Sequence, residues 1–347
     1  MLKVGINGLG RIGRAILRIN YYNNVFDIVA INDINPSNKN LAYMLKYDST
    51  YGVFDEDIIS NDSALLIGGD ANPIAIYHEK TISEVPWEKH KVDIIIDASG
   101  INENLLHKKE LQEKGIKHQV VTNTPDSNEI DKYIIIGVNE DAIDDSFLIS
   151  SSICDANAVS PILNILHKEF GIDHGFLTTL HPWLSYQNLL DGPSRSFAYP
   201  GTIIDNFTLG RASLNALIPK TTSVIRASAK VLGYLSEKFQ ALSFRVPTSI
   251  VSTADISVKL KTDTDKNDII NIFYQAEKKQ KYKIIKNNTD PLISTDFIKS
   301  DYSAIIDHRW TQINNSNYLK LVLWYDNEWG YSSRVVDLVR IITMNID

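Results

Sequence analysis

Several features that mark other classes of protein are scarce in this 347-residue sequence. It has one cysteine, Cys154, so no disulfide can form within the chain, which fits a reducing compartment. It has no block of basic residues, and 35 lysines and arginines against 42 aspartates and glutamates give a formal charge of −7. An acidic chain of this kind is a poor binder of nucleic acid or of an anionic membrane surface.

Long apolar runs are also missing. A typical run, residues 133–138, falls far short of the roughly 18 residues that cross a bilayer. The N-terminus lacks a basic head followed by a long apolar core. We therefore expect a cytoplasmic protein without a secretory signal or a membrane segment, and we expect no metal site.

What the chain does contain is ordinary for a globular protein, with 44% hydrophobic and 22% charged residues. Its length is enough for about two domains of roughly 150 residues each.

The N-terminal segment predicts a glycine-rich turn between a strand and a helix. An apolar stretch over 2–7 is followed at once by the sequence GLGRIG, and then by apolar residues at helical spacing over 14–22. In such a turn Gly8 allows the tight bend, Gly10 lets the backbone approach a pyrophosphate, and Gly13 lets the helix pack close to the strand. The helix N-terminus attracts phosphate, so we predict a dinucleotide site.

An acidic residue stands at the spacing that this site needs. A second predicted strand, over 26–33, ends in Asp33, about 20 residues after Gly13. Its carboxylate would bond the ribose hydroxyls and would repel the additional phosphate of NADP, so we expect NAD. The alternative is a structural turn with a surface aspartate.

Two further strands are predicted over 92–100 and 117–124, with a helix between them over 102–115. Ligands of open α/β sheets bind beyond the carboxyl ends of the strands. Ser99, Gly100 and Asn123 are therefore candidates for lining a cofactor site, although ordinary loop chemistry explains each equally well.

The second half of the chain carries a thiol and a histidine. Cys154 precedes an apolar-periodic stretch over 157–171, which predicts that it lies at a helix N-terminus. There the helix dipole lowers the pKa of a thiol and favours thiolate, whereas the neighbouring Asp155 acts in the opposite sense. A predicted strand over 176–183 carries His181, a candidate base. Taken alone, both residues are also compatible with buried structural roles.

The remaining predicted elements are simpler. Arg245 stands at a turn before a strand over 254–261, where it either binds an anion or is solvated. An amphipathic helix over 265–281, a strand over 318–326 and a terminal helix over 334–344 complete the pattern.

Six segments, in order along the chain, resemble the glyceraldehyde-3-phosphate dehydrogenase family, including its erythrose-4-phosphate dehydrogenase relatives. They are VGINGLGRIGR at 4–14, IND at 31–33, YMLKYDSTYGVF at 43–54, QNLLDGP at 187–193, FRVPT at 244–248 and WYDNEWGYSSRVVDL at 324–338. The resemblance implies an α/β fold with a Rossmann-type, doubly wound NAD-binding domain and an α+β catalytic domain with a mixed sheet. The NAD-binding domain would span 1–152 and be completed by a C-terminal helix at about 331–347, the catalytic domain would span 153–330, and the subunits would form a homotetramer.

The resemblance also implies roles for individual residues. Cys154 matches the nucleophile and His181 the base, and Pro193 matches the NAD-preferring form of the family. The residues implied to line the NAD site are Gly8, Gly10, Arg11, Ile12, Asp33, Ser99, Asn123, Asn327 and Tyr331, and the sequence patterns described above add Gly13 and Gly100. The substrate or anion site would involve Arg245, Thr222, Ser223 and Asp155.

The implied reaction oxidises an aldehyde, such as a sugar phosphate of the glyceraldehyde 3-phosphate type. The Cys154 thiolate attacks the aldehyde, and His181 takes the hydroxyl proton as hydride leaves for NAD. A thioester remains on the sulfur, and inorganic phosphate or water then cleaves it.

The sequence departs from the family pattern around phosphate. Ile153 and Asp155 stand where the family has serine and threonine hydroxyls on either side of the cysteine, and Leu184 replaces a threonine of the substrate's anion site. At about 4 Å and an effective dielectric of 20, a carboxylate would repel a phosphate charge by about 4 kcal/mol. The segment between Pro193 and Arg211 looks longer than the family's loop, which makes the tetramer less secure than the fold.

Three hypotheses follow from these residues. The first is phosphorylating oxidation of glyceraldehyde 3-phosphate, and the second is an aldehyde dehydrogenase whose thioester is released by water or whose substrate differs. The third is an NAD-binding relative that has lost catalysis, which the presence of both Cys154 and His181 disfavours.

Overall fold

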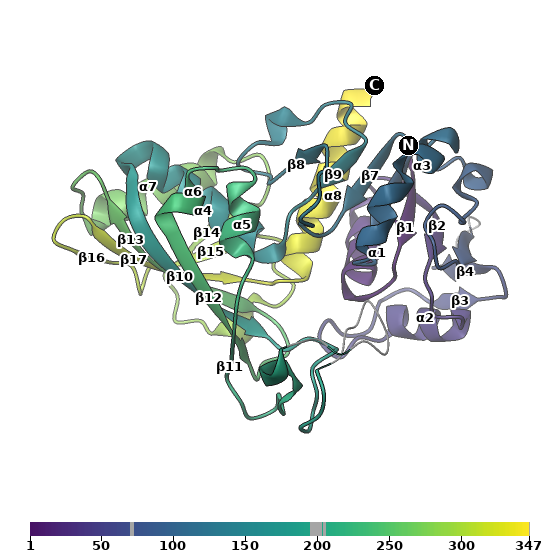
Figure 1. The fold of residues 1–347 in the computed structure, drawn as a ribbon, viewed down its shortest axis with the longest axis horizontal. Helices are drawn as coiled ribbons and strands as arrows, with labels where there is room; N and C mark the ends of the chain where they lie inside the picture. The colour runs from purple at the N-terminus through teal and green to yellow at the C-terminus, as the bar shows by residue number, and fades with distance from the viewer. Residues whose placement is uncertain (70–72, 195–202, 204–205, 347) are drawn as a thin grey trace. The chain divides into compact units, whose positions relative to one another are not determined.

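A computed structural model describes residues 1–69, 73–194, 203 and 206–346 (Figure 1). The chain divides into two compact units. Unit 1 comprises Met1–Ile134, Asn139–Ser152 and Ser332–Asp347, and unit 2 comprises Ile135–Val138 and Ile153–Tyr331. Most of the long segment predicted between Pro193 and Arg211 lies outside the described residues.

Unit 1 is built on a nine-stranded sheet with the order β3-β4-β5-β2-β1-β6-β7-β9-β8. All pairs from β5 to β8 are parallel, whereas β3 and β4 form an antiparallel hairpin and β4 pairs antiparallel to β5. The strands are β1 (Lys3–Asn7), β2 (Asp27–Asn32), β3 (Ile58–Ser60), β4 (Ala64–Ile67), β5 (Ile74–Tyr77), β6 (Ile94–Asp97), β7 (His118–Val121), β8 (Lys132–Tyr133) and β9 (Leu148–Ser150).

The order of the strands reverses at β1, because the chain runs from β1 to β2 on one side and reaches β6 on the other. A ligand of a doubly wound sheet binds at such a switch point, beyond the carboxyl ends of the strands. The predicted Rossmann-type fold is therefore confirmed. The helices of this unit are α1 (Arg11–Asn23), α2 (Asn38–Lys46), α3 (Lys108–Glu113) and most of α8 (Trp329–Ile346), with 3-10 turns η1 (Trp87–His90), η2 (Asn102–His107) and η3 (Glu140–Ala142).

The helix predicted over 102–115 is wrong in its first half. That half is the 3-10 turn η2, and α3 follows and ends before Gly115, whose φ of +84° is in the left-handed region. Glycine adopts that conformation at the lowest cost, so it closes the helix as expected.

Unit 2 is built on an eight-stranded mixed sheet with the order β11-β12-β10-β13-β17-β15-β14, and β16 pairs with β17 at the side. The pairs β10–β12 and β14–β15 are parallel and the others are antiparallel. This confirms the predicted mixed sheet. The strands are β10 (Ile172–Pro182), β11 (Ile218–Lys220), β12 (Phe239–Val246), β13 (Ser252–Leu260), β14 (Ile285–Asn288), β15 (Ala304–Asp307), β16 (Gln312–Asn314) and β17 (Tyr318–Tyr325).

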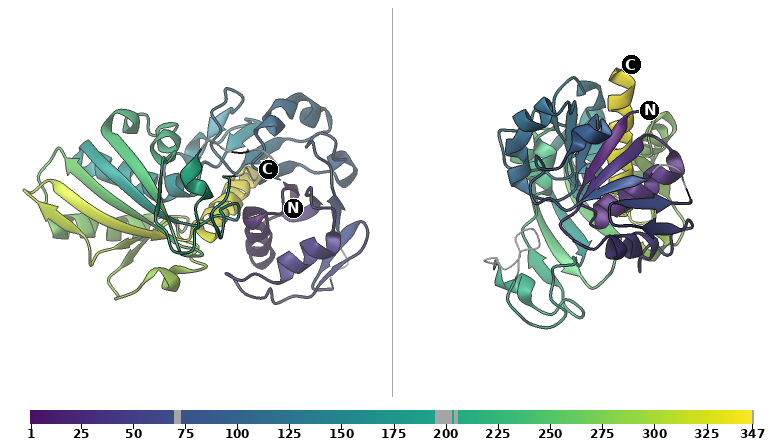
Figure 2. Two further views of the ribbon diagram at one scale, coloured as in Figure 1. Left: turned by 60° about the horizontal axis from the view of Figure 1, so that its bottom comes forward. Right: turned by 90° about the vertical axis from the view of Figure 1, so that its right-hand side faces the viewer.

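Helices cover one face of this sheet (Figure 2). Helix α4 (Cys154–Phe170) packs on β10, β13 and β15, and α5 (Val224–Ala229) and α6 (Leu235–Lys238) pack beside it on β12. Helix α7 (Lys266–Lys279) packs on β14, and 3-10 turns η4 (Phe207–Gly210) and η5 (Ser294–Phe297) complete the unit. Most of α4 is buried, so this helix is a rigid support for the residues at its start.

In the part of the chain that the structure describes, no helix is both long enough and apolar enough to cross a membrane.

Candidate active site

The glycine turn of unit 1 packs so closely that side chains are excluded at two of its positions. Gly8 has a φ of +94°, and a Cβ there would lie 2.7 Å from the Ser99 amide nitrogen. A Cβ on Gly13 would lie 2.1 Å from the Gly8 carbonyl oxygen. A Cβ on Gly10 would meet nothing within 4 Å, so space is open beside the residue that precedes α1.

This open turn fits the phosphates of a dinucleotide. Gly10 is the N-cap of α1, and no described side chain caps the helix or places an acid in its first turn. The first amides of a helix have no acceptor within it, and the dipole of this 13-residue helix favours an anion at that end. Ile12 is half-buried in the same turn.

Asp33 lies just beyond β2 and its carboxylate braces the glycine turn. Its Oδ2 accepts from the Leu9 amide at 2.7 Å and its Oδ1 accepts from the Asn35 amide at 2.8 Å. A carboxylate has about four acceptor positions, so both oxygens keep capacity for the hydroxyls of a ribose.

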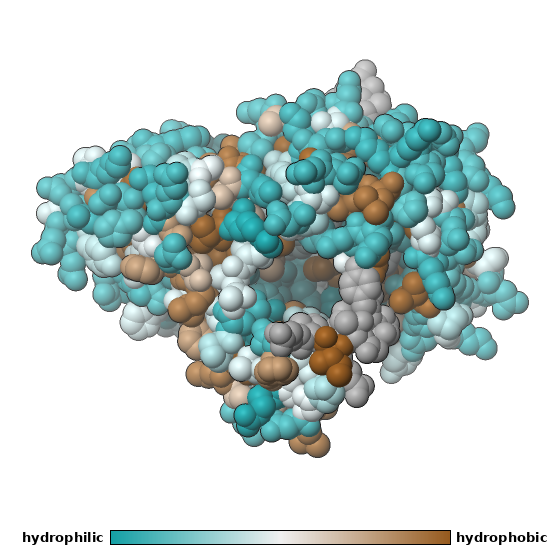
Figure 3. Space-filling model, in the orientation of Figure 1, coloured by the Kyte–Doolittle hydropathy of each residue, from teal (hydrophilic) through white to brown (hydrophobic). Residues whose placement is uncertain are grey.

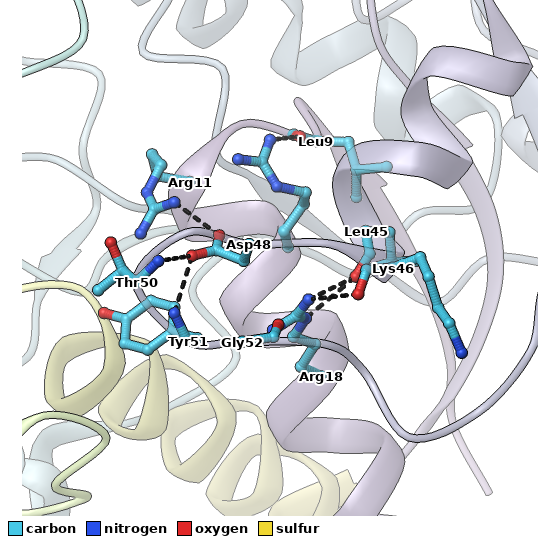
Figure 4. A network of polar contacts seen from close by, with 10 residues as sticks. Leu9, Arg11, Arg18, Leu45, Lys46, Asp48, Thr50, Tyr51 and Gly52 are labelled. Carbon is cyan, nitrogen blue, oxygen red and sulfur yellow. Dashed lines mark hydrogen bonds and ion pairs between the residues drawn. The ribbon is translucent and has the colours of Figure 1, made fainter.

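Arg11 is held by an ion pair with Asp48, in which Nη1 lies 2.6 Å from Oδ2 (Figure 4). The other oxygen of Asp48 accepts from the amides of Thr50 and Tyr51 at 2.8 and 2.9 Å. Burial raises the pKa of Asp48, but these amides and Arg11 outweigh it, so the pKa is lowered. The ion pair places the guanidinium over the ring of Tyr51, 5.3 Å from its centroid.

The candidates at the ends of β6 and β7 are placed differently from one another. Ser99 Oγ donates to Asp97 at 2.6 Å and accepts from the side-chain amide of Asn104, so this hydroxyl already forms hydrogen bonds with neighbours in unit 1. Gly100 has a φ of +74° and open space beside it. Asn123 is half-buried and donates to Asn102 at 3.2 Å.

Asn327 and Tyr331 belong to unit 2. Asn327 is buried, and among the described residues its Oδ1 has no hydrogen-bond partner. An orphaned buried acceptor is a group that a donor on a bound ligand would satisfy. Tyr331 is buried in the first turn of α8.

The thiol lies at the start of α4, where the sequence predicted it, and it is half-buried. The sulfur of Cys154 lies 3.8 Å from Nε2 of His181, and its S–H donates to Oδ1 of Asp155 at 3.4 Å. Ligand atoms of these three residues all lie within 4.8 Å of one another, a spacing that also suits one metal ion, although the sequence predicted none.

Strand pairing brings a histidine and an arginine together beside the thiol. In the parallel pair β10–β12, His181 lies directly opposite Arg245. The Pro182 carbonyl accepts from His181 Nδ1 at 2.9 Å and from Arg245 Nη1 at 3.2 Å, and the guanidinium also contacts Nδ1. In the tautomer that carries its ring proton on Nδ1, the lone pair of Nε2 is on the side of the ring that faces the sulfur.

The pKa of His181 suits a base. Burial, aided by the Arg245 cation, lowers it to about 4. The ring is therefore neutral near pH 7, which is the form that accepts a proton.

The pKa of Cys154 is raised well above its ordinary value, first by burial and then by the charge of Asp155, which also accepts the S–H bond. The sequence left the direction open, because a helix N-terminus lowers the pKa of a thiol and a neighbouring carboxylate raises it. In the structure desolvation and the carboxylate outweigh the Arg245 cation.

Asp155 is buried and has a second donor that the sequence did not reveal. Its Oδ1 also accepts from the Tyr325 hydroxyl at 2.8 Å. Burial and the charge of Asp155 raise the pKa of Tyr325 well above its ordinary value, so the hydroxyl stays a donor at neutral pH. No local pattern marks Tyr325, because its contact depends on β17 and α4 meeting in the folded unit.

Lys220 is a further charged group that sequence reasoning missed. Burial and the Arg245 charge lower its pKa, while Asp155 and Cys154 raise it, so its ammonium is electrically coupled to the thiol site. The ammonium donates to the Thr221 carbonyl at 2.6 Å.

The other predicted anion residues have structural roles at a helix start. Thr222 Oγ1 accepts from the Val224 amide at 3.2 Å, and Ser223 is the N-cap of α5. Leu184, which offers no side-chain donor, gives its amide to Gln187 at 2.8 Å.

The fold and these groups define a class: a protein with a dinucleotide-type α/β unit and a second, mixed-sheet unit that holds a cysteine beside a neutral histidine. Comparison with known proteins then identifies the family. Residues 2–105 match the NAD binding domain of glyceraldehyde 3-phosphate dehydrogenase, and residues 153–327 match its C-terminal domain. The chain belongs to the glyceraldehyde-3-phosphate dehydrogenase family.

Relatives match over nearly the whole chain. Glyceraldehyde-3-phosphate dehydrogenase 2 of Bacillus subtilis (strain 168) is 33% identical, with 98% of this chain and 96% of the relative covered. The cytosolic glyceraldehyde-3-phosphate dehydrogenase of Chondrus crispus is 37% identical, with 98% of both chains covered. That of Gracilaria gracilis is 36% identical, with 97% of both covered.

Proposed function

We propose that this protein is an NAD-dependent dehydrogenase that oxidises an aldehyde of the glyceraldehyde 3-phosphate type. The carrying observation is the sulfur of Cys154 3.8 Å from Nε2 of His181. Family membership supports NAD as the cofactor and glyceraldehyde 3-phosphate as the aldehyde, because the relatives are named for that substrate.

Cys154 is the proposed nucleophile. Neutral His181 takes the thiol proton through Nε2 as the sulfur attacks the aldehyde carbon. The raised pKa of Cys154 keeps the sulfur protonated in the free site, so proton transfer accompanies attack rather than preceding it. Arg245 and Lys220 supply positive charge for the oxyanion or for a substrate phosphate.

Protonated His181 gives its proton to the oxyanion of the adduct, which becomes a hydroxyl, and the neutral ring then takes that hydroxyl proton back while hydride leaves the carbon. NAD, when bound, accepts this hydride. The product on the protein is a thioester of Cys154.

The glycine turn of unit 1 is proposed to hold the cofactor, together with Arg11, Ile12, Asp33, Ser99, Gly100 and Asn123. Asn327 and Tyr331 are proposed as NAD-binding residues by resemblance to the family, and the orphaned Oδ1 of Asn327 suits an amide donor. Residues 1–152 with the C-terminal helix would thus be the NAD-binding domain, and 153–330 the catalytic domain.

We also propose a homo-oligomer, a tetramer by resemblance to the family. The uncovered face of the unit 2 sheet supports association: Phe176 is 60% exposed, Leu242 45% and Leu180 37%, on the adjacent strands β10 and β12. Apolar groups also gather near β10 and β12 in the space-filling view (Figure 3).

A cytoplasmic location is proposed because two relatives are named cytosolic.

The test is a rapid-mixing experiment that follows NADH with glyceraldehyde 3-phosphate and NAD. We expect a burst of about one NADH per subunit as Cys154 is acylated. Cys154→Ala should abolish it, and His181→Asn should slow it about 10²–10⁴-fold. The matched control is His174→Asn, because His174 is exposed on the same strand. A burst that survives Cys154→Ala would refute the proposal.

A further inference from the structure

The carboxylate of Asp155 has no part in the acylation chemistry proposed above, yet it contacts the reacting sulfur. Its Oδ1 holds two donors at once, the Cys154 thiol at 3.4 Å and the Tyr325 hydroxyl at 2.8 Å. It is buried at the first turn of a rigid helix, so its position is fixed.

Acylation removes one of these two donors. A thioester sulfur carries no hydrogen, so Oδ1 keeps the Tyr325 hydroxyl and loses its bond from Cys154. A buried carboxylate oxygen that loses a donor favours a replacement, and a water molecule can supply it. That water would lie beside the thioester, bonded to a base.

The same carboxylate disfavours phosphate as the acyl acceptor. Like charges within about 4–6 Å repel, and inorganic phosphate is an anion. Ile153, the N-cap of α4, offers no side-chain donor to attract it. Arg245 and Lys220 are the cations that oppose this effect, and each already donates to a backbone carbonyl.

We propose that water is the acyl acceptor of this enzyme, with Asp155 as the general base and Tyr325 as a positioning residue that acts through it. The inference rests on the proposed function, because it needs the thioester that aldehyde oxidation forms. The protein would then release a carboxylic acid and no acyl phosphate.

The step balances without a further reagent. Asp155 takes a proton from water as the water oxygen bonds to the thioester carbon. The carbon–sulfur bond then breaks, Asp155 returns its proton to the Cys154 sulfur, and the carboxylic acid leaves and loses its own proton to solvent. Aldehyde, NAD⁺ and water thus become carboxylate, NADH and two protons.

The experiment follows NADH from glyceraldehyde 3-phosphate and NAD in a buffer with a chelator, from which inorganic phosphate is removed enzymatically. We expect a burst of about one NADH per subunit, followed by steady turnover that added phosphate does not accelerate. In ¹⁸O-labelled water the acid product should gain one labelled oxygen.

Two variants test the residues. Asp155→Asn should keep the burst and slow the later turnover about 10²–10⁴-fold, as expected for loss of a general base. Tyr325→Phe should slow the later turnover about tenfold, because it removes a hydrogen bond to a charged group. Asp268→Asn is the matched control, since it removes an aspartate from the first turn of α7 and should change neither phase.

The outcomes separate the two proposals. A burst that then stalls until phosphate is added would overturn water as the acceptor and leave aldehyde oxidation standing. Absence of any NADH formation, in a burst or in the steady state, would overturn the oxidation itself, and the inference with it. Full phosphate-free turnover in Asp155→Asn would overturn the role of the carboxylate, and if that variant does not fold, the phosphate dependence of the unaltered protein decides.

Discussion

Replacing Asp155 by asparagine should lower the pKa of the Cys154 thiol. The substitution keeps the size of the side chain and an oxygen that accepts the S–H bond. It removes a negative charge whose oxygen lies 3.4 Å from the sulfur. Burial, the larger cause of the raised pKa, is unchanged, so the change in pKa isolates the effect of the charge.

The size of the change can be bounded. Two unit charges about 4 Å apart interact by about 1 kcal/mol in water and about 4 kcal/mol at an effective dielectric of 20. At 1.36 kcal/mol per pKa unit, the pKa of Cys154 should fall by about 1 to 3 units. For a fall of about two units, the thiolate fraction at pH 7 rises about 100-fold while thiolate nucleophilicity drops about tenfold, so alkylation should be about tenfold faster.

The assay is the rate of iodoacetamide alkylation as a function of pH. Cys154 is the single cysteine of the chain, so all labelling of thiol reports this sulfur. The midpoint of the rate profile should move to lower pH in Asp155→Asn and stay in place in the control Asp268→Asn. An unchanged or higher midpoint would refute the argument that the Asp155 charge holds the proton on the sulfur.

Three other outcomes can be measured. Gly13→Ala should destabilise the fold by about 1–3 kcal/mol in urea unfolding, because the added Cβ meets a backbone oxygen. Gly10→Ala should leave stability unchanged, because its Cβ meets nothing within 4 Å, but it should weaken NAD binding measured by calorimetry. Burial lowers the pKa of His308 to about 4, below its ordinary 6.5, so the unfolded chain binds more protons than the folded chain between these two pH values. The free energy of unfolding should therefore fall by up to roughly 3 kcal/mol as pH drops from 6.5 to 4, and it should fall less in His308→Asn. Phe176→Asp should reduce the mass of the oligomer in light scattering, whereas Leu106→Asp, at a 67% exposed position of unit 1, should not.

Much of the fold follows from local sequence patterns. The strands β1, β2, β6 and β7 fall within the stretches whose apolar runs predicted them, and the glycine turn follows β1 as expected. The start of α4 at Cys154 could also be predicted, because the helix spacing begins just after it. These features depend on residues close together in the chain, so periodicity and turn chemistry suffice.

The contacts within the thiol site could not be predicted in the same way. The distance from Cys154 to His181 depends on how α4 packs on β10, and the pairing of His181 with Arg245 depends on the register of β10 and β12. The direction of the thiol pKa depends on burial, which no local pattern supplies. The role of Tyr325 could not be predicted from local sequence either, since 170 residues separate it from its hydrogen-bond partner Asp155.

One boundary between the two units falls between Ser152 and Ile153, one residue before the nucleophile. The thiol, the histidine, the carboxylate and the tyrosine that donates to it thus all lie in one continuous segment of the sequence, Ile153–Tyr331. Mutations there can retune the fate of the thioester while the glycine turn upstream stays as it is. The residues proposed to select the acyl acceptor are in this sense separate in sequence from the glycine turn, so a substitution at Asp155 can change the one without altering the other.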